Sequence, residues 1–277
     1  MKNLIIRALT GIIFVAVLVG AIFLHPLSFL AVFAIITGLS LWEFYGLIGH
    51  HEKESLKKIL NCLAGTYLFV ATFFYAYDLS SEIIFIPYLF YLIYTFTAEL
   101  YYKADNPINN WAFTLLAQIY CAGSFSMLNL IAAIPETPGE MAHTPLFVFA
   151  LFVFIWLNDT GAYLVGSLIG RHRLFERISP KKSWEGFYGG LFVALAASQV
   201  FAWIAPEIGR LNWIGLAATI VIFGTWGDLV ESLMKRTLQV KDSGHILPGH
   251  GGMLDRFDSA MMAIPAAYIY IELFIRN

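Results

Sequence analysis

The chain has 277 residues, of which 59% are hydrophobic and only 13% are charged. Soluble domains carry roughly 25% charged residues, so this composition excludes an ordinary soluble protein and predicts an integral membrane protein. The formal net charge of −2 is close to neutral and says little about partners, and we expect no nucleic acid among them. The two cysteines, Cys62 and Cys121, fall at or within apolar runs and indicate neither a disulfide nor a thiolate metal site.

Apolar runs long enough to cross a bilayer, about 17–25 residues each, recur along the chain. In chain order we predict nine membrane-spanning helices: Ala8–Leu24, Leu27–Leu47, Ile59–Tyr77, Ile83–Tyr101, Trp111–Ile134, Leu146–Ile169, Phe187–Ala205, Trp213–Met234 and Ser259–Ile275. Runs of this length indicate helices and not barrel strands, because backbone groups in lipid must be paired internally. The first run lacks a small-residue cleavage site after it, so we interpret it as a retained helix and not a signal peptide.

The sequence therefore predicts an all-α polytopic membrane protein. We expect a single integral membrane domain over residues 1–277, with mostly scaffold helices in residues 1–145 and the motifs in residues 146–277.

Basic residues are concentrated in every second predicted loop, which places them on one side of the membrane. With the N-terminus in the cytoplasm, all of the 17 Lys and Arg residues fall on the cytoplasmic side except Arg210 and Arg276. Such an excess is the positive-inside signal. Most acidic residues inside the spans lie towards the same side, which favours a cavity open to the cytosol.

Five acidic residues lie within predicted spans, where charged side chains are costly and commonly functional. They are Glu43, Glu99, Asp159, Asp228 and Glu231. For Glu43 and Glu99 we expect snorkelling towards the interface or pairing with loop lysines. Asn158 and Asp159 are equally compatible with helix packing and with a site, whereas the neighbouring glycines indicate close helix contacts.

Asp228 starts a helical series that continues with Glu231, Ser232 and Lys235. Spacings of three, four and seven residues place these side chains on one helix face. We expect an intrahelical salt bridge between Glu231 and Lys235, which leaves Asp228 as a candidate site residue.

The loop 171–186 contains Ser179, Lys181, Lys182 and Glu185 just before the seventh span. Hydroxyls and ammonium groups beside a helix N-terminus suit a polyphosphate, but anionic lipid headgroups would be attracted to the same charges.

The segment from Ser232 to Asp258, SLMKRTLQVKDSGHILPGHGGMLDRFD, is a polar stretch between two hydrophobic runs. Its turn at Gly249, His250, Gly251 and Gly252 permits close approach of a phosphate to the backbone, although it is not a Walker motif. The segment also contains three carboxylates suited to Mg²⁺, those of Asp242, Asp255 and Asp258. A zinc site at His245 and His250 is disfavoured because no accompanying zinc ligands are present. Asp258 could instead cap a last helix that begins at the next residue.

This segment resembles the signature of phosphatidate cytidylyltransferases, also called CDP-diglyceride synthases. The segments Ser179–Gly186 and Asn158–Tyr163 resemble two further elements of the family, and the resemblance covers roughly the last 120 residues. It implies transfer of the cytidylyl group of CTP to phosphatidic acid, which gives CDP-diacylglycerol and pyrophosphate with Mg²⁺ as cofactor. It further implies membrane lipids as surroundings, a bacterial inner membrane with the site facing the cytosol, a monovalent cation such as K⁺ beside the Mg²⁺, and a homodimer.

The resemblance also implies a metal centre at Asp228 and Asp255. From the charge that such a reaction must neutralise, we expect further roles for the basic and polar residues of the motifs. The CTP phosphates and pyrophosphate would be bound by Ser179, Lys181, Lys182, Lys241, His250, Gly251, Gly252 and Arg256. Lys241 and Asp242 are also candidate catalytic residues, together with Asp228 and Asp255. The lipid phosphate would be met by Ser232, Lys235 and Arg236. Asn158, Asp159, Glu185 and Asp258 are secondary candidates.

Two other interpretations remain open at the level of sequence. One is a related CTP-dependent enzyme that acts on an ether-lipid phosphate or a polyprenol, because apolar helices do not disclose which lipid tail they accept. The other, from a different class, is an ion-coupled secondary transporter, which also has many spans, membrane carboxylates and glycine-interrupted helices. A CDP-alcohol phosphotransferase is disfavoured because its Asp-Gly-x-x-Ala-Arg element is absent.

Overall fold

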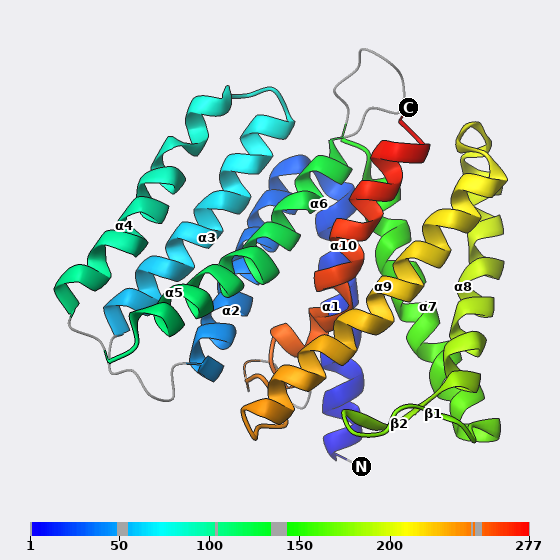
Figure 1. Ribbon diagram of the computed structural model, residues 1–277. Helices are drawn as coiled ribbons and strands as arrows, with labels where there is room; N and C mark the ends of the chain where they lie inside the picture. The colour runs from blue at the N-terminus through cyan, green and yellow to red at the C-terminus, as the bar shows by residue number, and fades with distance from the viewer. Residues whose placement is uncertain are drawn as a thin grey trace. The chain divides into compact units, whose positions relative to one another are not determined.

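The computed structural model describes residues 2–48, 55–102, 105–133, 143–244, 246 and 251–276, without the side chains of residues 2–8 and 55–56. Within these ranges the protein is almost entirely helical, as predicted (Figure 1). Eight helical segments are long and apolar enough to cross a membrane, and the apolar part of α1, Leu9–Leu24, adds a shorter one. All nine predicted spans therefore coincide with helices. Lys53, Lys103, His245, Gly249 and His250 lie outside the described residues.

Two compact units make up the chain. The first comprises Met1–Thr144 together with Asp242–Arg256, and the second comprises Pro145–Lys241 together with Phe257–Asn277.

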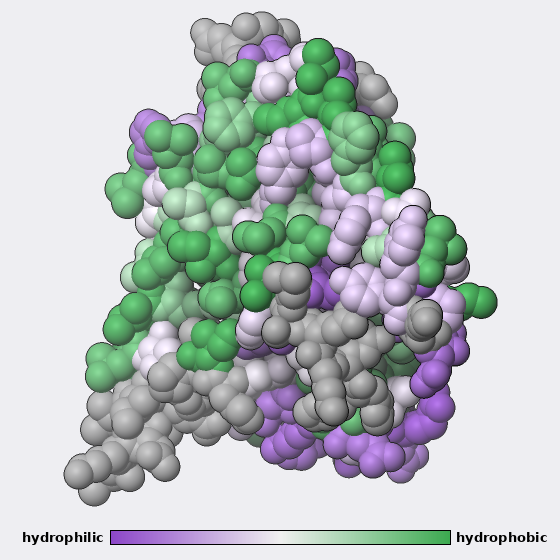
Figure 2. Space-filling model, turned by 90° about the vertical axis from the view of Figure 1, so that its left-hand side faces the viewer, coloured by the Kyte–Doolittle hydropathy of each residue, from purple (hydrophilic) through white to green (hydrophobic). Residues whose placement is uncertain are grey.

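The first unit contains the helices of the predicted scaffold half. They are α1 (Lys2–Leu24), α2 (Pro26–Ile48), α3 (Ser55–Ala76), a 3₁₀ turn η2 (Glu82–Phe85) that leads into α4 (Ile86–Tyr102), and a continuous run of α5 (Pro107–Ala117), the π-helical η3 (Gln118–Gly123) and α6 (Ser124–Ala132). Aromatic side chains such as Phe29, Phe33 and Phe69 fill its interior and are fully buried. The outer face of α4 exposes Leu89, Phe90 and Ile93 instead. Figure 2 views the molecule from this side and shows hydrophobic side chains over much of the visible surface, as a lipid-facing helix requires.

Glu99 and Glu43 of the first unit have different surroundings. Glu99 binds Lys57 with an Oε1–Nζ distance of 3.1 Å, so the predicted pairing with a lysine is confirmed. Glu43 does not snorkel, and among the described residues no lysine pairs with it, contrary to the prediction. It is 5% exposed and accepts hydrogen bonds from the hydroxyl of Ser243 and the backbone N–H of Leu254. These partners are 200 and 211 residues away, which is why no local pattern indicated them.

The second unit contains α7 (Pro145–Ile169), a two-stranded antiparallel hairpin of β1 (Arg173–Phe175) and β2 (Ser179–Ser183), α8 (Trp184–Ile204), a short η4 (Pro206–Ile208), α9 (Arg210–Thr237) and most of α10 (Leu254–Phe274). Helix α7 packs against α8 and α9, and α8 packs against α9. The hairpin was not predicted, and it occupies the segment expected to be a loop. In Figure 1 it lies beside the lower ends of α7, α8 and α9.

Helix α10 begins at Leu254, five residues before the predicted start of the last span. The predicted capping of this helix by Asp258 is therefore wrong, because Asp258 lies inside the second turn. The early start has a physical cause: the carboxylates of Glu43 and Asp255 accept the N–H groups of Leu254 and Gly252 at the helix entry.

Candidate active site

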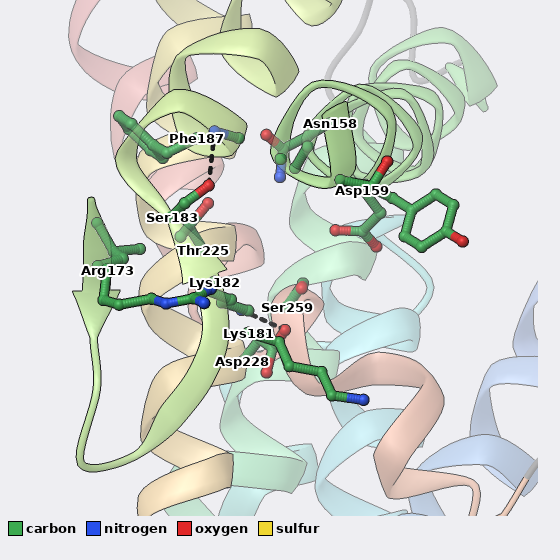
Figure 3. Close-up of a pocket in the computed structure, with 16 residues that line it drawn as sticks. Asn158, Asp159, Arg173, Lys181, Lys182, Ser183, Phe187, Thr225, Asp228 and Ser259 are labelled. Atoms are coloured by element: carbon green, nitrogen blue, oxygen red, sulfur yellow. Dashed lines mark hydrogen bonds and ion pairs between the residues drawn. The ribbon is translucent and has the colours of Figure 1, made fainter. Parts of the chain in front are cut away.

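A cavity of about 540 Å³ opens in the second unit among α7, the hairpin, α8, α9 and α10. Its volume is within the range typical of small-molecule sites, about 300–1,000 Å³. Charged and hydroxyl side chains from every one of the surrounding segments except α8 reach it: Asp159, Arg173, Lys181, Lys182, Asp228 and Ser259 (Figure 3). The cavity therefore combines fixed cations on one element with carboxylates on two others.

The hairpin carries the cations, and its attachment to α8 decides where they lie. Arg173 pairs with Ser183 in the strand register, and the N–H of Trp184 donates to the carbonyl of His172 at 2.9 Å. The Glu185 carboxylate accepts the backbone N–H groups of Arg171 and His172 at 3.1 and 3.2 Å and binds the His172 ring at 2.6 Å. Glu185 thus holds the base of the hairpin against the first turn of α8, while Arg173, Lys181 and Lys182 line the cavity.

Close packing of α7 and α8 forms the opposite wall. Ser183 caps α8 by accepting the N–H of Gly186 at 3.1 Å. A Cβ at Gly186 would lie 2.8 Å from the Ala162 carbonyl oxygen, and one at Gly190 would lie 2.4 Å from Asn158 Oδ1. The predicted glycines of α7 lie at the same contact, since a Cβ at Gly161 would lie 3.0 Å from Gly190 Cα and one at Gly166 would lie 3.4 Å from Gly186 Cα. These glycines therefore permit close helix contact, as predicted. Asn158 is buried at this contact and also lines the cavity, so its position is compatible with both roles that the sequence left open.

Asp228 is the acidic residue on the α9 side of the cavity. Its Oδ2 forms an ion pair with Lys182 Nζ (Figure 3). Its Oδ1 accepts a hydrogen bond from Ser232 Oγ at 3.2 Å. Both side chains of the ion pair remain about one-quarter exposed. A carboxylate whose partner is a flexible, partly solvated ammonium group can exchange that partner for a ligand at low cost.

The basic residues at the end of α9 have partners within the second unit. Lys235 Nζ lies 3.0 Å from Glu231 Oε1, which confirms the predicted intrahelical salt bridge. Arg236 Nε donates to the Ile178 carbonyl in the hairpin turn at 3.5 Å. The end of α9 thus helps to hold the hairpin.

Asp258 of α10 adds a further acid to this region. The charges of Asp228, Glu231 and Asp159 all act on its carboxyl group, so three helices contribute acids that repel one another. A cation beside such a group reduces this repulsion, and Lys182 supplies one at Asp228.

Asp255 belongs to the first unit, and backbone N–H groups donate to its Oδ2. The N–H groups of Ser243 and Gly252 both donate to this oxygen at 2.9 Å. Gly251 has a φ of +83°, in the left-handed region that favours glycine, and a Cβ there would lie 3.0 Å from Asp255 Oδ2. The glycine pair expected to approach a phosphate therefore also shapes the surroundings of this carboxylate.

The remaining predicted residues are distributed as follows. Lys241, Asp242 and Arg256 are exposed, and Ser179 is half-buried at the start of β2. His250 is outside the described residues. Sequence reasoning missed Arg173, Thr225 and Ser259 as cavity residues. Thr225 could have been found, since it lies one helical turn before Asp228, whereas Arg173 reaches the cavity only because of the hairpin pairing.

The oxygen ligands of the cavity fit Mg²⁺ bound together with a phosphate substrate. Hydroxyl and carboxylate oxygens from Asp228, Asp159, Thr225 and Ser259 line it, and these are hard donors. Among the described residues, no three Asp, Glu, His or Cys side chains form a metal site by themselves. Mg²⁺ commonly uses only one or two carboxylates and takes its other ligands from phosphate and water, so the arrangement suits a metal–nucleotide complex better than a resident metal ion.

The sequence profile of the cytidylyltransferase family matches residues 5–274. Among curated proteins, the phosphatidate cytidylyltransferase of Staphylococcus aureus is 46% identical over 138 residues, which cover 49% of this chain and 52% of that protein. The phosphatidate cytidylyltransferase of Staphylococcus saprophyticus is 45% identical over 162 residues, 58% of each chain. That of Bacillus subtilis is 37% identical over 187 residues, 67% of each chain. The matched stretch thus spans about half to two-thirds of these relatives.

Proposed function

The chain belongs to the cytidylyltransferase family, and from this premise we propose that it transfers the cytidylyl group of CTP to phosphatidic acid, with release of pyrophosphate. The observation that carries the proposal is the cavity in which Lys181, Lys182 and Arg173 lie with Asp228. A site for a polyphosphate needs this combination of fixed cations and an acid that can hold a metal ion. The names of the relatives point to the same lipid substrate.

The main barrier to this reaction is electrostatic repulsion. The attacking phosphate of the lipid is already an anion, so it needs no general base, but it must approach the α-phosphate of a highly charged triphosphate. Fixed positive charges that neutralise the triphosphate lower this barrier without reorganising during the reaction. The lysines of the hairpin, whose base Glu185 holds against α8, would supply that charge once they bind the triphosphate, and Lys241 and Arg256 would add to it around the departing pyrophosphate.

We assign the binding of Mg²⁺ to Asp228 and Asp255, which the resemblance to the family's metal centre suggests. When bound, Mg²⁺ would supply additional neutralisation of the triphosphate and of the leaving pyrophosphate. Ser232 keeps Asp228 oriented through its hydrogen bond, and Lys182 would shift from Asp228 towards a phosphate oxygen when CTP enters. Lys235 and Arg236, at the end of α9, would hold the lipid phosphate at headgroup depth.

A direct assay tests this proposal. Purified protein is incubated with CTP labelled at its α-phosphate, phosphatidic acid and Mg²⁺, and the products are separated into lipid and aqueous fractions. We expect labelled CDP-diacylglycerol and stoichiometric pyrophosphate, and neither product when Mg²⁺ is chelated. No labelled liponucleotide under any of these conditions would contradict the proposed function.

The same assay separates the alternatives. Ether-linked phosphatidic acid is offered with the same label, and a polyprenol is offered with CTP labelled at its γ-phosphate, because phosphorylation of the polyprenol would transfer that phosphate and release CDP. A preference for either acceptor by kcat/KM would reassign the lipid substrate. Proteoliposomes loaded with a labelled solute test the transporter hypothesis, since flux without CTP consumption would support a carrier and contradict an enzyme.

We also propose that the hairpin faces the cytosol. Glu176 in the hairpin turn and Glu207 between α8 and α9 are both exposed, and the positive-inside pattern puts them on opposite sides of the membrane. The variants Glu176→Cys and Glu207→Cys should react with a membrane-impermeant maleimide from opposite sides of intact cells. The native Cys62 and Cys121 are buried, so their background should be low. Labelling of Glu176→Cys from outside would contradict the proposed orientation and support the opposite one.

A further inference from the structure

One buried carboxylate of α2 holds the connection that leads from α9 into α10. Glu43 Oε2 accepts a hydrogen bond from Ser243 Oγ at 3.1 Å and one from the Leu254 N–H at 2.8 Å. The first N–H groups of a helix have no partner within the helix, and a nearby negative charge stabilises them. Glu43 therefore caps α10 from another helix of the first unit, more than 200 residues away in the chain.

The Ser243 hydroxyl joins this carboxylate to Asp255. It donates to Glu43 and accepts the N–H of Asp255 at 3.3 Å, while the Ser243 N–H donates to Asp255 Oδ2. The Gly252 N–H donates to the same oxygen. Reorienting Asp255 would break hydrogen bonds from two different backbone positions, so its direction depends on where Ser243 and Gly252 are held.

Two glycines show how closely Glu43 fits. A Cβ at Gly244 would lie 2.4 Å from Glu43 Oε1, and a Cβ at Gly252 would lie 2.4 Å from Glu43 Oε2 and 2.1 Å from Ser243 Oγ. Neither position can carry a side chain while Glu43 stays in place. These glycines are thus needed by the carboxylate, apart from any approach of a phosphate to the backbone.

Stability alone does not account for Glu43. Its two hydrogen-bond donors are neutral, and its second oxygen, Oε1, is buried without a hydrogen-bond partner in the described part of the chain. Burying a carboxylate with incomplete pairing costs free energy. A buried carboxylate of this kind is expected where the protein needs it to fix the position of neighbouring groups, and not where it is needed for stability.

We propose that Glu43 is a positioning residue for the cytidylyl transfer, because it fixes Ser243 and the first turn of α10 and thereby orients the Asp255 carboxylate for the Mg²⁺–CTP complex. The inference rests on the proposed function. It assigns Glu43 no contact with substrate, and it makes Asp255 a pre-organised ligand whose geometry is set before any ligand binds. Partners that orient metal ligands typically change metal affinity or activity by about 10–100-fold when they are removed.

The test uses Glu43→Gln, which keeps the size of the side chain and removes its charge, and Glu99→Gln as the matched control. Glu99 is also an acid within a helix of the first unit, but it pairs with Lys57. Two measurements need no turnover: hydrogen exchange of the backbone amides of Gly252 and Leu254 without ligands, and binding of Mn²⁺ in the presence of CTP by electron paramagnetic resonance. In the activity assay, the half-saturating Mg²⁺ concentration is compared with the K_M for phosphatidic acid.

For Glu43→Gln we expect faster amide exchange at both positions, Mn²⁺ binding weakened by about tenfold or more, and a similar rise in the Mg²⁺ requirement with little change in the K_M for the lipid. Glu99→Gln should resemble the wild type in all of these. Wild-type exchange and Mn²⁺ binding in Glu43→Gln would overturn the inference even if the enzyme is active. An inactive wild type would overturn the proposed function, while the exchange and Mn²⁺ measurements would still decide the role of Glu43.

Ser243→Ala covers the case in which Glu43→Gln does not fold. It breaks the link between Glu43 and Asp255 without changing a buried charge, and we expect smaller shifts in the same direction. If Ser243→Ala folds and leaves both amide exchange and Mn²⁺ affinity unchanged, the proposed chain of orientation is wrong.

Discussion

The two carboxylates that we assign to Mg²⁺ are held in opposite ways. Asp228, in the second unit, binds the ammonium group of Lys182, and both side chains stay partly exposed to the cavity. Asp255, in the first unit, accepts the backbone N–H groups of Ser243 and Gly252, and Glu43 holds these residues in turn. The first carboxylate is neutralised by a mobile charge, whereas the second is oriented by neutral donors fixed to the backbone.

This difference indicates a division of roles. An ammonium group on a long side chain can leave Asp228 when a triphosphate arrives, so the carboxylate becomes available together with the ligand. Backbone donors cannot move away without unfolding the turn, so Asp255 is pre-organised and contributes to stability as well. Substitutions at the two acids should therefore agree in their effect on turnover and differ in their effect on stability.

The largest expected effect is the loss of activity in Asp228→Asn and Asp255→Asn. Each removes a proposed metal ligand, and we expect Mg²⁺-dependent formation of CDP-diacylglycerol to fall by at least about a thousandfold. Only Asp255→Asn should also lower the free energy of unfolding, by about 1–3 kcal/mol, because it weakens the acceptor of two N–H groups. Asp228→Asn should change it little, since the freed Lys182 is partly solvated.

Turnover of labelled CTP and thermal unfolding in detergent measure these two effects. Glu272→Gln, which removes an acid that pairs with Arg276 on the exposed end of α10, is the control. Near-normal turnover in either aspartate variant contradicts the metal assignment, and equal stability losses contradict the distinction between the two acids.

The sequence was enough to predict the Asp228 half of this comparison, but not the surroundings of Asp255. Asp228 was recognisable because it is a charged residue in an apolar run and shares a helix face with Ser232 and Lys235. The spans were recognisable because lipid demands long apolar helices. The role of Glu43 was not, because its partners lie more than 200 residues away, and the start of α10 depends on that contact. The hairpin was missed because its strands are three and five residues long and rich in charge, unlike typical strand sequences.

A second prediction concerns the mobile partner of Asp228. Lys182→Met should raise the K_M for CTP by about 10–100-fold, since it removes a charge-assisted contact to phosphate. Lys181→Met should have a smaller effect, because Lys181 lines the cavity but is more exposed to solvent. Arg177→Gln, in the exposed hairpin turn, removes an equal charge outside the cavity lining and should leave the K_M unchanged. Equal effects of all three substitutions would indicate general attraction of CTP to a basic surface.

A third prediction tests the close fit around the held carboxylate. Gly252→Ala should lower the free energy of unfolding by about 1–3 kcal/mol, because its Cβ would overlap Ser243 Oγ and Glu43 Oε2. Removing the hydroxyl in the double variant Ser243→Ala/Gly252→Ala should recover part of this loss. The four proteins form a thermodynamic cycle, measured by thermal unfolding. Strict additivity would mean that Gly252 serves another purpose than making room for Ser243 and Glu43.

The smallest expected effect is a pH dependence of stability in the first unit, where neutral groups hold His143. This ring accepts a hydrogen bond from the Tyr77 hydroxyl and donates from Nε2 to the Ile22 carbonyl at 2.7 Å. Burial, together with the nearby His25, lowers the pKa of His143, against the opposing effect of the Ile22 carbonyl.

The unfolded chain then binds a proton more readily than the folded one. The contribution of His143 to stability is therefore complete above the unfolded pKa of about 6.5 and declines as the pH falls below it. Between pH 7.5 and 5 we expect the wild type to lose more stability than His143→Phe, which cannot titrate, and unfolding curves in detergent at several pH values measure this difference. Parallel curves for the two proteins would contradict this prediction, because they would show that protonation of His143 does not destabilise the folded state. The neutral contacts of the first unit would then accommodate a charge as readily as the cavity around Asp228 does.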